Sequence, residues 1–356
     1  MADLITRTAK RYYEEVYLQN IGAQFFNKIF GIPDESTTAA FTLDKFTSSP
    51  FALTYRQKDG QSRVTQYTAG SSTTVEPPIA SRKTPLSEDI LDSVAAGVEA
   101  DGGYGPNEAQ QVNQILRDHV GGLNMLKNKQ AIDVLQYGYF YALGPEGADV
   151  GLNITFGRDA GNSLTYDFTD AAATITAAFV EAQAQMIAMG TPYQDQVVVL
   201  GSDWQTEFTT DATVLAFMQN NAMNQLMVAQ MAPPELLGIE GLFVLGQYRS
   251  AGMLAPLWVT AYAPPIAYVK DEGETSEPYV PTTNAIFFSL ADTRYKINRG
   301  VNALDDMGQR VRLVGDLVID RYSENDPVTE FIRTSTRHCF VPANIDHTVY
   351  TVGTFT

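Results

Sequence analysis

Apolar side chains first gather near the N-terminus, over residues 4–30. Many of them are aromatic, and the spacing of three to four positions predicts an amphipathic segment. The stretch ends at Gly31-Ile32-Pro33, where proline prevents a helix from continuing. We expect an arm that packs on something outside itself. Its larger apolar residues are Tyr12, Tyr13, Val16, Tyr17, Ile21, Phe25, Phe26, Ile29 and Phe30.

Residues 39–82 have a different character, rich in Thr, Ser and Gly with alternating apolar positions. Phe51 and Tyr55 lead into Asp59-Gly60, and Tyr67 lies on the far side of that pair. Asp-Gly between alternating runs predicts a tight β-hairpin, because both residues tolerate positive φ. An isolated two-stranded hairpin is marginally stable in water, so this one also requires a partner.

Helical periodicity dominates the next part of the chain. Apolar residues fall mostly three or four apart over 107–137, which predicts one long helix that ends before Gly138 and can bend at Gly121-Gly122. A second helix is expected over residues 170–189, capped by Asp170 and followed by Gly190.

The run 196–201 is short and continuously apolar, which is typical of a buried strand. Ser202 with Gln205 has the form of a capping box and opens a predicted helix through Met218. Beyond Pro233-Pro234 the pattern is mainly β, interrupted by a polar loop. Helices and strands are mixed without βαβ alternation, so we expect an α+β fold. The expected strands are 241–247, 257–262, 267–270, 285–290, 312–319 and 349–351, and the loop is 271–281.

Charge and cysteine content narrow the functional classes. The chain has 24 Lys and Arg against 41 Asp and Glu, a net charge of −17, and neither sign forms a long block. This argues against an ordinary DNA-binding role. Cys339 is the single cysteine, so no intrachain disulfide can form, as expected for a reducing cytosol. We expect no signal peptide, because the first residues lack its basic-then-apolar order, and no membrane span, because no run approaches about 20 apolar residues.

Candidate catalytic and metal-binding groups are few. Two histidines, His338 and His347, lie near Cys339 and Asp346, but without a recognised zinc-ligand spacing. A plain strand pair is the favoured interpretation, and zinc the alternative. His119 lies on the apolar stripe of the long helix, where a core or interface histidine is favoured over a catalytic base.

Nucleophile and nucleotide motifs are absent as well. His338 and Cys339 are neighbours on a predicted strand and would point to opposite faces, so the imidazole would not reach the thiol. The acidic pairs Glu14-Glu15, Asp305-Asp306 and Asp316 with Asp320 are typical of solvated faces rather than glycosidase carboxylates. No phosphate-binding loop is present. We therefore expect no enzymatic activity, no cofactor and no metal.

Four segments resemble pieces of one protein family. They are residues 40–44 (AFTLD), 75–79 (VEPPI), 131–138 (AIDVLQYG), and the run 326–332 (DPVTEFI) through 337–342 (RHCFVP). In order and spacing the chain resembles the lambda-type major capsid proteins of tailed bacteriophages, which share the Hong Kong 97 fold.

The resemblance implies a five-part architecture and a structural function. Family members assemble hexamers and pentamers into an icosahedral head that encloses double-stranded DNA, with a portal protein, a scaffolding protein and, in some members, a decoration protein as partners. No long charged prefix precedes the arm, which suggests scaffolding in trans. The expected location is the virion head, assembled in the host cytoplasm. The expected parts are an N-terminal arm (1–38), an extended loop (39–82), a peripheral domain (83–195) with a spine helix at 107–137, an axial domain (196–328) and returning C-terminal strands (329–356).

Nine residues are candidates for contacts between subunits, because aromatic side chains dominate such interfaces. For each, burial in the core of its own subunit is the alternative. Lys58 lies at the predicted hairpin tip, but no partner for a covalent crosslink can be matched. Other functions left open are an encapsulin-like nanocompartment shell, a tail or decoration subunit, and a soluble enzyme. The nine candidates are Tyr12, Tyr13, Phe25, Phe26, Phe30, Phe51, Tyr55, Lys58 and Tyr67.

Overall fold

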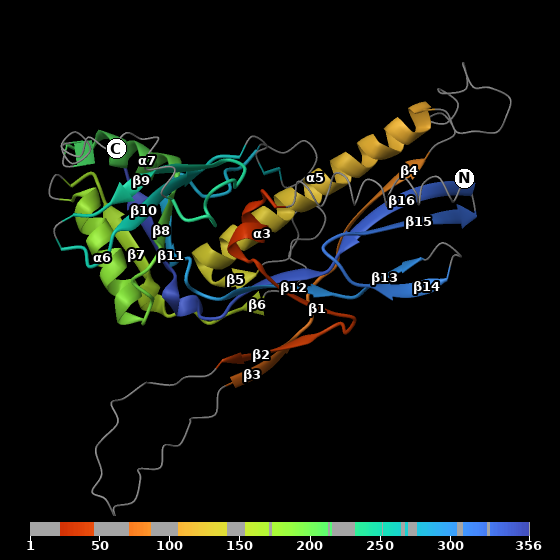
Figure 1. Cartoon of the computed structure of the whole chain (residues 1–356), viewed down its shortest axis with the longest axis horizontal. Helices are drawn as coiled ribbons and strands as arrows, with labels where there is room; N and C mark the ends of the chain where they lie inside the picture. The colour runs from red at the N-terminus through yellow and green to blue at the C-terminus, as the bar shows by residue number, and fades with distance from the viewer. Residues whose placement is uncertain are drawn as a thin grey trace, which may run out of the picture.

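A computed structural model of the 356-residue chain shows an α+β fold with one long helix between two groups of strands (Figure 1). None of its described helices is long and apolar enough to cross a membrane. The described residues are 22–45, 71–86, 106–140, 154–170, 173–212, 214–215, 232–250, 252–264, 268–269, 276–304, 309–325 and 328–355.

A six-stranded mixed sheet forms one end of the molecule, in the order β7-β18-β11-β8-β10-β9. The central strand β8 has five buried residues, as its run of valines requires in a sheet covered on both faces. Helices α6 and α7 pack on one face, over Val198, Phe287 and Val349. Figure 1 shows this unit on the left. Its elements are β7 (Ser163–Asp167), α6 (Ile175–Ala188), β8 (Gln196–Leu200), α7 (Ser202–Thr210), β9 (Leu242–Tyr248), β10 (Leu257–Tyr262), β11 (Asn284–Ser289) and β18 (Val349–Thr354).

The long helix α5 (Pro106–Tyr137) confirms the helix predicted over residues 107–137. Its 32 residues span about 48 Å at 1.5 Å per residue, and it continues through Gly121-Gly122 without a break. It ends where predicted, because Gly138 has a φ of +73°, a conformation that glycine adopts without strain. The Arg158 guanidinium donates to the carbonyl groups of Leu135 and Gln136, which have no partner within the helix.

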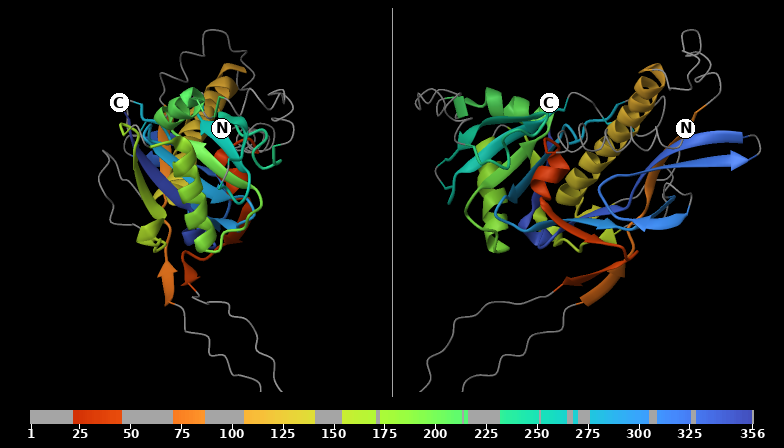
Figure 2. Two further views of the ribbon diagram at one scale, coloured as in Figure 1. Left: turned by 90° about the vertical axis from the view of Figure 1, so that its left-hand side faces the viewer. Right: turned by 45° about the vertical axis from the view of Figure 1, so that its right-hand side comes forward.

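Two three-stranded sheets and three strand pairs complete the fold. Helix α5 lies against both three-stranded sheets, β1-β12-β17 and β15-β16-β4, and the second extends away from the six-stranded unit (Figures 1 and 2). The pairs are β2-β3, β5-β6 and β13-β14. The bounds are α3 (Phe25–Ile29), β1 (Ile32–Ser36), β2 (Phe41–Lys45), β3 (Ser71–Val75), β4 (Ala80–Leu86), β5 (Tyr139–Phe140), β6 (Ile154–Thr155), β12 (Arg294–Arg299), β13 (Val301–Leu304), β14 (Arg310–Leu313), β15 (Val318–Asn325), β16 (Val328–Thr336) and β17 (His338–Pro342), with short 3-10 turns at Ala160–Asn162 and Ile345–His347.

Several predicted boundaries were wrong. Helix α6 starts at Ile175, because the Thr174 hydroxyl accepts a hydrogen bond from the Ala177 amide and so caps it in place of Asp170. Helix α7 is capped at Gly201 and ends at Thr210, before residue 218. The single strand expected over 312–319 is two, since the chain turns at residues 314–317 between β14 and β15.

The domain boundary placed at residue 195 does not coincide with a break between sheets. Strand β7 precedes it and strand β8 follows it, yet both belong to the six-stranded sheet. Strand β18, from the C-terminal segment, pairs with β7 and β11 in the same sheet. Long-range pairing of this kind leaves no local mark in the sequence, which is why the boundary was misplaced.

Candidate assembly surfaces

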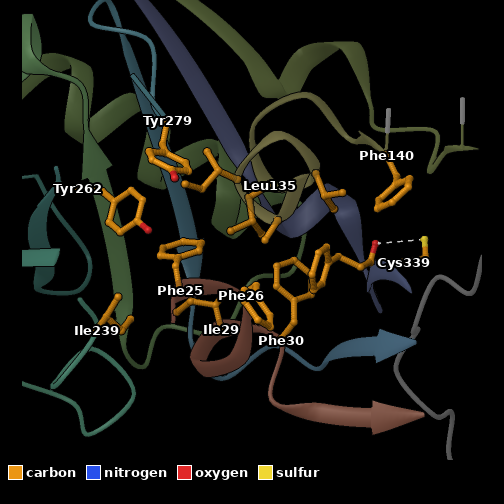
Figure 3. Close-up of a cluster of buried hydrophobic side chains, with 14 of the residues drawn as sticks. Phe25, Phe26, Ile29, Phe30, Leu135, Phe140, Ile239, Tyr262, Tyr279 and Cys339 are labelled. Carbon is orange, nitrogen blue, oxygen red and sulfur yellow. Dashed lines mark hydrogen bonds between the residues drawn. The ribbon is translucent and has the colours of Figure 1, made fainter. Parts of the chain in front are cut away.

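Three of the nine predicted contact residues lie in the interior of their own subunit. Phe25, Phe26 and Phe30 are at most 1% exposed. Figure 3 shows α3 turning them into the core beside α5, where Phe26 and Phe30 pack on Phe340 at ring-centroid distances of 5.8 and 5.1 Å. The expectation that these three are intersubunit anchors is therefore wrong, and the alternative, an intrasubunit core, holds.

The other six candidates, in the arm and the extended loop, fall outside the described residues. They are Tyr12, Tyr13, Phe51, Tyr55, Lys58 and Tyr67.

The predicted extended loop begins and ends in a two-stranded stem, β2-β3. Phe41 and Val75 face each other at its root and are each 8% exposed. The Arg299 guanidinium lies 5.3 Å from the centre of the Phe41 ring. Within the described part of the chain, these two strands pair only with each other. The stem is therefore held to the body at one end, and Figure 1 shows it projecting below the body.

Buried polar side chains connect the spine helix to its neighbours. The His119 ring nitrogens contact the Thr84 hydroxyl on β4 at 2.7 Å and the Thr334 hydroxyl on β16 at 3.1 Å. Burial, reinforced by the charge of Arg82, lowers the pKa of His119 to about 4. His119 is thus a neutral, hydrogen-bonded core histidine, which confirms the favoured interpretation.

Two further residues of α5 fix the neighbouring segments. Asn128 accepts a hydrogen bond from the Phe26 amide at 3.2 Å and donates to Gln24 at 2.9 Å, which positions α3. Gln130 contacts Nε2 of His338 on β17 at 2.6 Å. Because such contacts have defined geometry, they fix the register of the helix more sharply than apolar packing alone.

An ion cluster lies where α5, β12 and the turn at 314–317 meet. The Asp316 carboxylate accepts from the Lys296 ammonium at 2.7 Å and from the Asn298 amide at 3.1 Å. The Lys127 ammonium donates to the Asp316 carbonyl at 2.5 Å and lies 3.9 Å from its carboxylate. Both ammonium groups also face the Phe26 ring. Two cations therefore share one carboxylate in the interior.

The cluster shifts the pKa values of its members. Burial by itself would raise the pKa of Asp316, but Lys127 and Lys296 together lower it. Burial lowers the pKa of Lys127 to about 8, although Asp316 opposes that shift. The expectation that Asp316 and Asp320 form a solvated acidic pair is wrong. Asp316 is enclosed by this cluster, and Asp320 is bound by Arg333 on β16.

The C-terminal histidines and cysteine are held apart. Nδ1 of His347 lies 2.7 Å from Asp292, whereas His338 contacts Gln130. Burial raises the pKa of the Cys339 thiol well above its usual range and lowers that of His338. A buried thiol of this kind is a poor nucleophile. Among the described residues, no group of three potential ligands is placed to bind a metal ion.

Residues 159–248 contain no Lys, Arg or His, although an even distribution of the 24 basic residues would place about six there. The feature is not visible as a block of like charge, because the acidic residues of this span are separated in the sequence. The span carries ten acidic residues: Asp159, Asp167, Asp170, Glu181, Asp195, Asp203, Glu207, Asp211, Glu235 and Glu240.

Four of these acids surround one cluster of aromatic rings, and we call them the acidic face: Asp167, Glu181, Asp203 and Glu207. Glu181 accepts from the Tyr166 hydroxyl at 2.8 Å, and Asp167 is bonded to Thr169. Trp204, between the two acids of α7, packs on Phe168 at 4.9 Å.

The acidic face lacks compensating charge. None of its four carboxylates forms an ion pair with a described residue. On α7, Asp203 and Glu207 lie four residues apart, and like charges so placed cost about 0.2–0.5 kcal/mol in an isolated helix.

An exposed apolar side chain lies at one edge of the six-stranded sheet. Strands β7 and β9 are the two edge strands, and Phe243 on β9 is 58% exposed. An outer strand has one row of backbone groups without a strand partner, which makes it a natural contact for another chain.

Comparisons with known proteins agree with this fold. A family model described as phage major capsid protein E matches residues 18–352. The chain is similar to the crystal structure of a prophage capsid protein from E. coli CFT073, with a TM-score of 0.55, 14% identity and 93% of each chain covered. It is also similar to a capsid structure of cyanophage P-SCSP1u, with a TM-score of 0.47, 11% identity, and 91% of this chain and 86% of that chain covered. No curated protein sequence matches it.

The long spine helix, the projecting strand stem and the flanking α+β units define a shell subunit of the Hong Kong 97 fold. The chain belongs to the phage major capsid protein E family, and it is a structural component of the phage head.

Proposed function

We propose that the chain builds the head shell as hexamers and pentamers, with each subunit reaching over its neighbour through the extended loop. The β2-β3 stem supports this most directly. It is rooted in the body by Phe41 and Val75 and then projects away from it. Many such contacts in a closed lattice make shell stability collective.

We assign the parts of the subunit from the sheet topology. The six-stranded sheet with α6 and α7 is the axial unit around the capsomer centre. Helix α5 with the sheet β15-β16-β4 is the peripheral unit. Of residues 1–38, proposed as the N-terminal arm, α3 and β1 belong to the body, and residues 39–82 are the extended loop. The shell encloses double-stranded DNA, with a portal protein, a scaffolding protein and a decoration protein as partners, and it assembles in the host cytoplasm. The role is structural rather than enzymatic.

The test is electron microscopy and sedimentation of the full chain, expressed alone and with a candidate scaffolding protein. Shells, capsomers or curved sheets are expected. A variant in which a Gly-Ser linker replaces residues 46–70 retains the stem and should remain folded but fail to form closed shells. A stable monomer or dimer of the unaltered chain under both conditions would refute the proposal.

A further inference from the structure

Helix α3 contacts both the axial unit and the spine helix α5. On the axial side, the ring of Phe25 lies 5.1 Å from that of Tyr262, at the end of β10, and Figure 3 shows the two rings turned towards each other. The Ala23 carbonyl accepts a hydrogen bond at 2.8 Å from the amide of Glu240, which lies just before β9. On its other side, α3 packs on α5 and on Phe340 of β17.

One side chain joins the two sides directly. Gln24 donates to the Glu240 carboxylate at 3.1 Å and accepts from the Asn128 side chain on α5 at 2.9 Å. Asn128 in turn accepts from the Phe26 amide at 3.2 Å. An amide side chain carries a donor and an acceptor in fixed directions, so it bridges two groups only when they are held in defined positions. A continuous series of hydrogen bonds therefore runs from the axial unit through α3 to the spine helix.

The position of this bridge along α5 gives it control over an angle. Near the C-terminal end of the helix, the ring of Tyr137 lies 5.9 Å from that of Tyr350 on β18, so α5 also contacts the axial unit there. Asn128 precedes Tyr137 by nine residues, which is about 14 Å along a helix at 1.5 Å per residue. Two separated contacts fix the angle between a helix and a sheet, whereas one contact leaves it free to pivot.

The sequence of α3 suits a connecting role better than an independent one. The helix has five residues, too few to be stable by itself. Gln24 occupies its N-cap position, yet the Gln24 side chain makes no capping hydrogen bond to the helix. Its donor and its acceptor are used instead for the bridge between Glu240 and Asn128. The contacts to the two units therefore position α3.

We infer that α3 is a joint that fixes the angle between the axial unit and the spine helix, and that Gln24 is the side chain that locks it. This rests on the proposed function, in which the axial units meet at the capsomer centre and the spine helices run outward from them. In such a shell, the angle within each subunit sets the curvature of the capsomer. Motions between packed units are governed by a few residues at the point where the units meet.

Reversing the polarity of one hydrogen bond tests the joint. Gln24→Glu places a second carboxylate against that of Glu240 and should separate the two units. Adding Glu240→Gln restores a donor facing an acceptor at the original net charge, so the double variant should behave like the unaltered chain. The matched control is Gln114→Glu on the exposed surface of α5, where Gln114 donates to Asp118 at 3.0 Å. It creates a similar pair of like charges within α5 itself.

The angle is measured in the full chain before assembly, as the distance between spin labels at Arg117→Cys on α5 and Ala184→Cys on α6. Both positions are exposed, and the buried Cys339 does not compete for the label. Gln24→Glu should broaden the distribution of distances by about twofold or more, because the two units then sample alternative angles. The double variant should restore the narrow distribution, and the control should leave it unchanged.

Shell geometry is the second measurement. With Gln24→Glu, electron microscopy should show shells of mixed diameter or open curved sheets, and the double variant should give shells of the original diameter. If Gln24→Glu does not fold, Gln24→Ala removes the bridge without adding charge and takes its place.

Three outcomes would overturn the inference while the capsid function stands. They are an unchanged distance distribution in a folded Gln24 variant, a broadening that the control reproduces, and a broadening that the double variant does not reverse. If the unaltered chain forms no shells, the proposed function fails, and the label distances still decide whether α3 is a joint.

Discussion

Neutralising Asp316 should destabilise the subunit far more than neutralising Lys127, although the two residues belong to one cluster. The reason is stoichiometry. Asp316 serves both Lys127 and Lys296, so Asp316→Asn leaves two buried cations without a carboxylate. Lys127→Met leaves Lys296 and Asp316 as a balanced pair at 2.7 Å.

The expected magnitudes follow from the burial of the cluster. Removing one partner of a buried ion pair costs about 3–5 kcal/mol. The Asp316 side chain is 16% exposed, so we expect the lower end, about 3 kcal/mol, for Asp316→Asn. With an unfolding entropy of about 2.1 cal/mol/K per residue, that lowers the melting temperature of a chain of this length by about 4 °C. Lys127→Met removes one hydrogen bond and should cost about 1 kcal/mol or less, because methionine retains most of the packing against Phe26.

The assay is urea unfolding of the unassembled subunit at low concentration, followed by tryptophan fluorescence and circular dichroism at pH 7. Conditions without capsomers are needed, since assembly would raise apparent stability by mass action. Equal losses for the two variants would refute the two-to-one arrangement of charges, as would a loss for Lys127→Met that exceeds the loss for Asp316→Asn.

Three further predictions concern the core. Because the pKa of His119 is lowered in the folded state, the unfolded chain binds more protons between about pH 6.5 and pH 4, and the free energy of unfolding should fall as the pH falls across that window. His119→Gln should weaken this pH dependence, measured as the urea midpoint against pH. An unchanged slope of midpoint against pH would contradict the prediction. Phe26→Ala should cost about 3–5 kcal/mol in the unassembled subunit, where an intersubunit anchor would cost almost nothing. Cys339 should resist thiol reagents in the native subunit and react at the rate of unfolding, so fast labelling of folded protein would show that the site is open.

Local pattern in the sequence determined the elements whose stability is local. The spine helix ends at Gly138 because glycine accepts positive φ, and this could be predicted from one residue. Strand β8 followed from a run of valines between polar residues. The hairpin predicted around Asp59-Gly60 lies outside the described residues, whereas the antiparallel pair β2-β3 that flanks it was not predicted as strands.

Only the tertiary structure decided which side chains meet. The aromatic residues of α3 would give the same sequence pattern whether they contacted a neighbouring subunit or their own core. Only the structure shows that they pack on Phe340 in their own core. The pairing of β7 with β18 joins residues nearly 200 positions apart in the sequence. Because of it, the six-stranded sheet includes strands from both sides of the domain boundary predicted at residue 195. The sequence pattern predicted that Asp316 is a surface acid, but in the structure it contacts Lys127 and Lys296, which belong to distant elements. Such contacts depend on burial and long-range geometry, which hydrophobic periodicity does not encode.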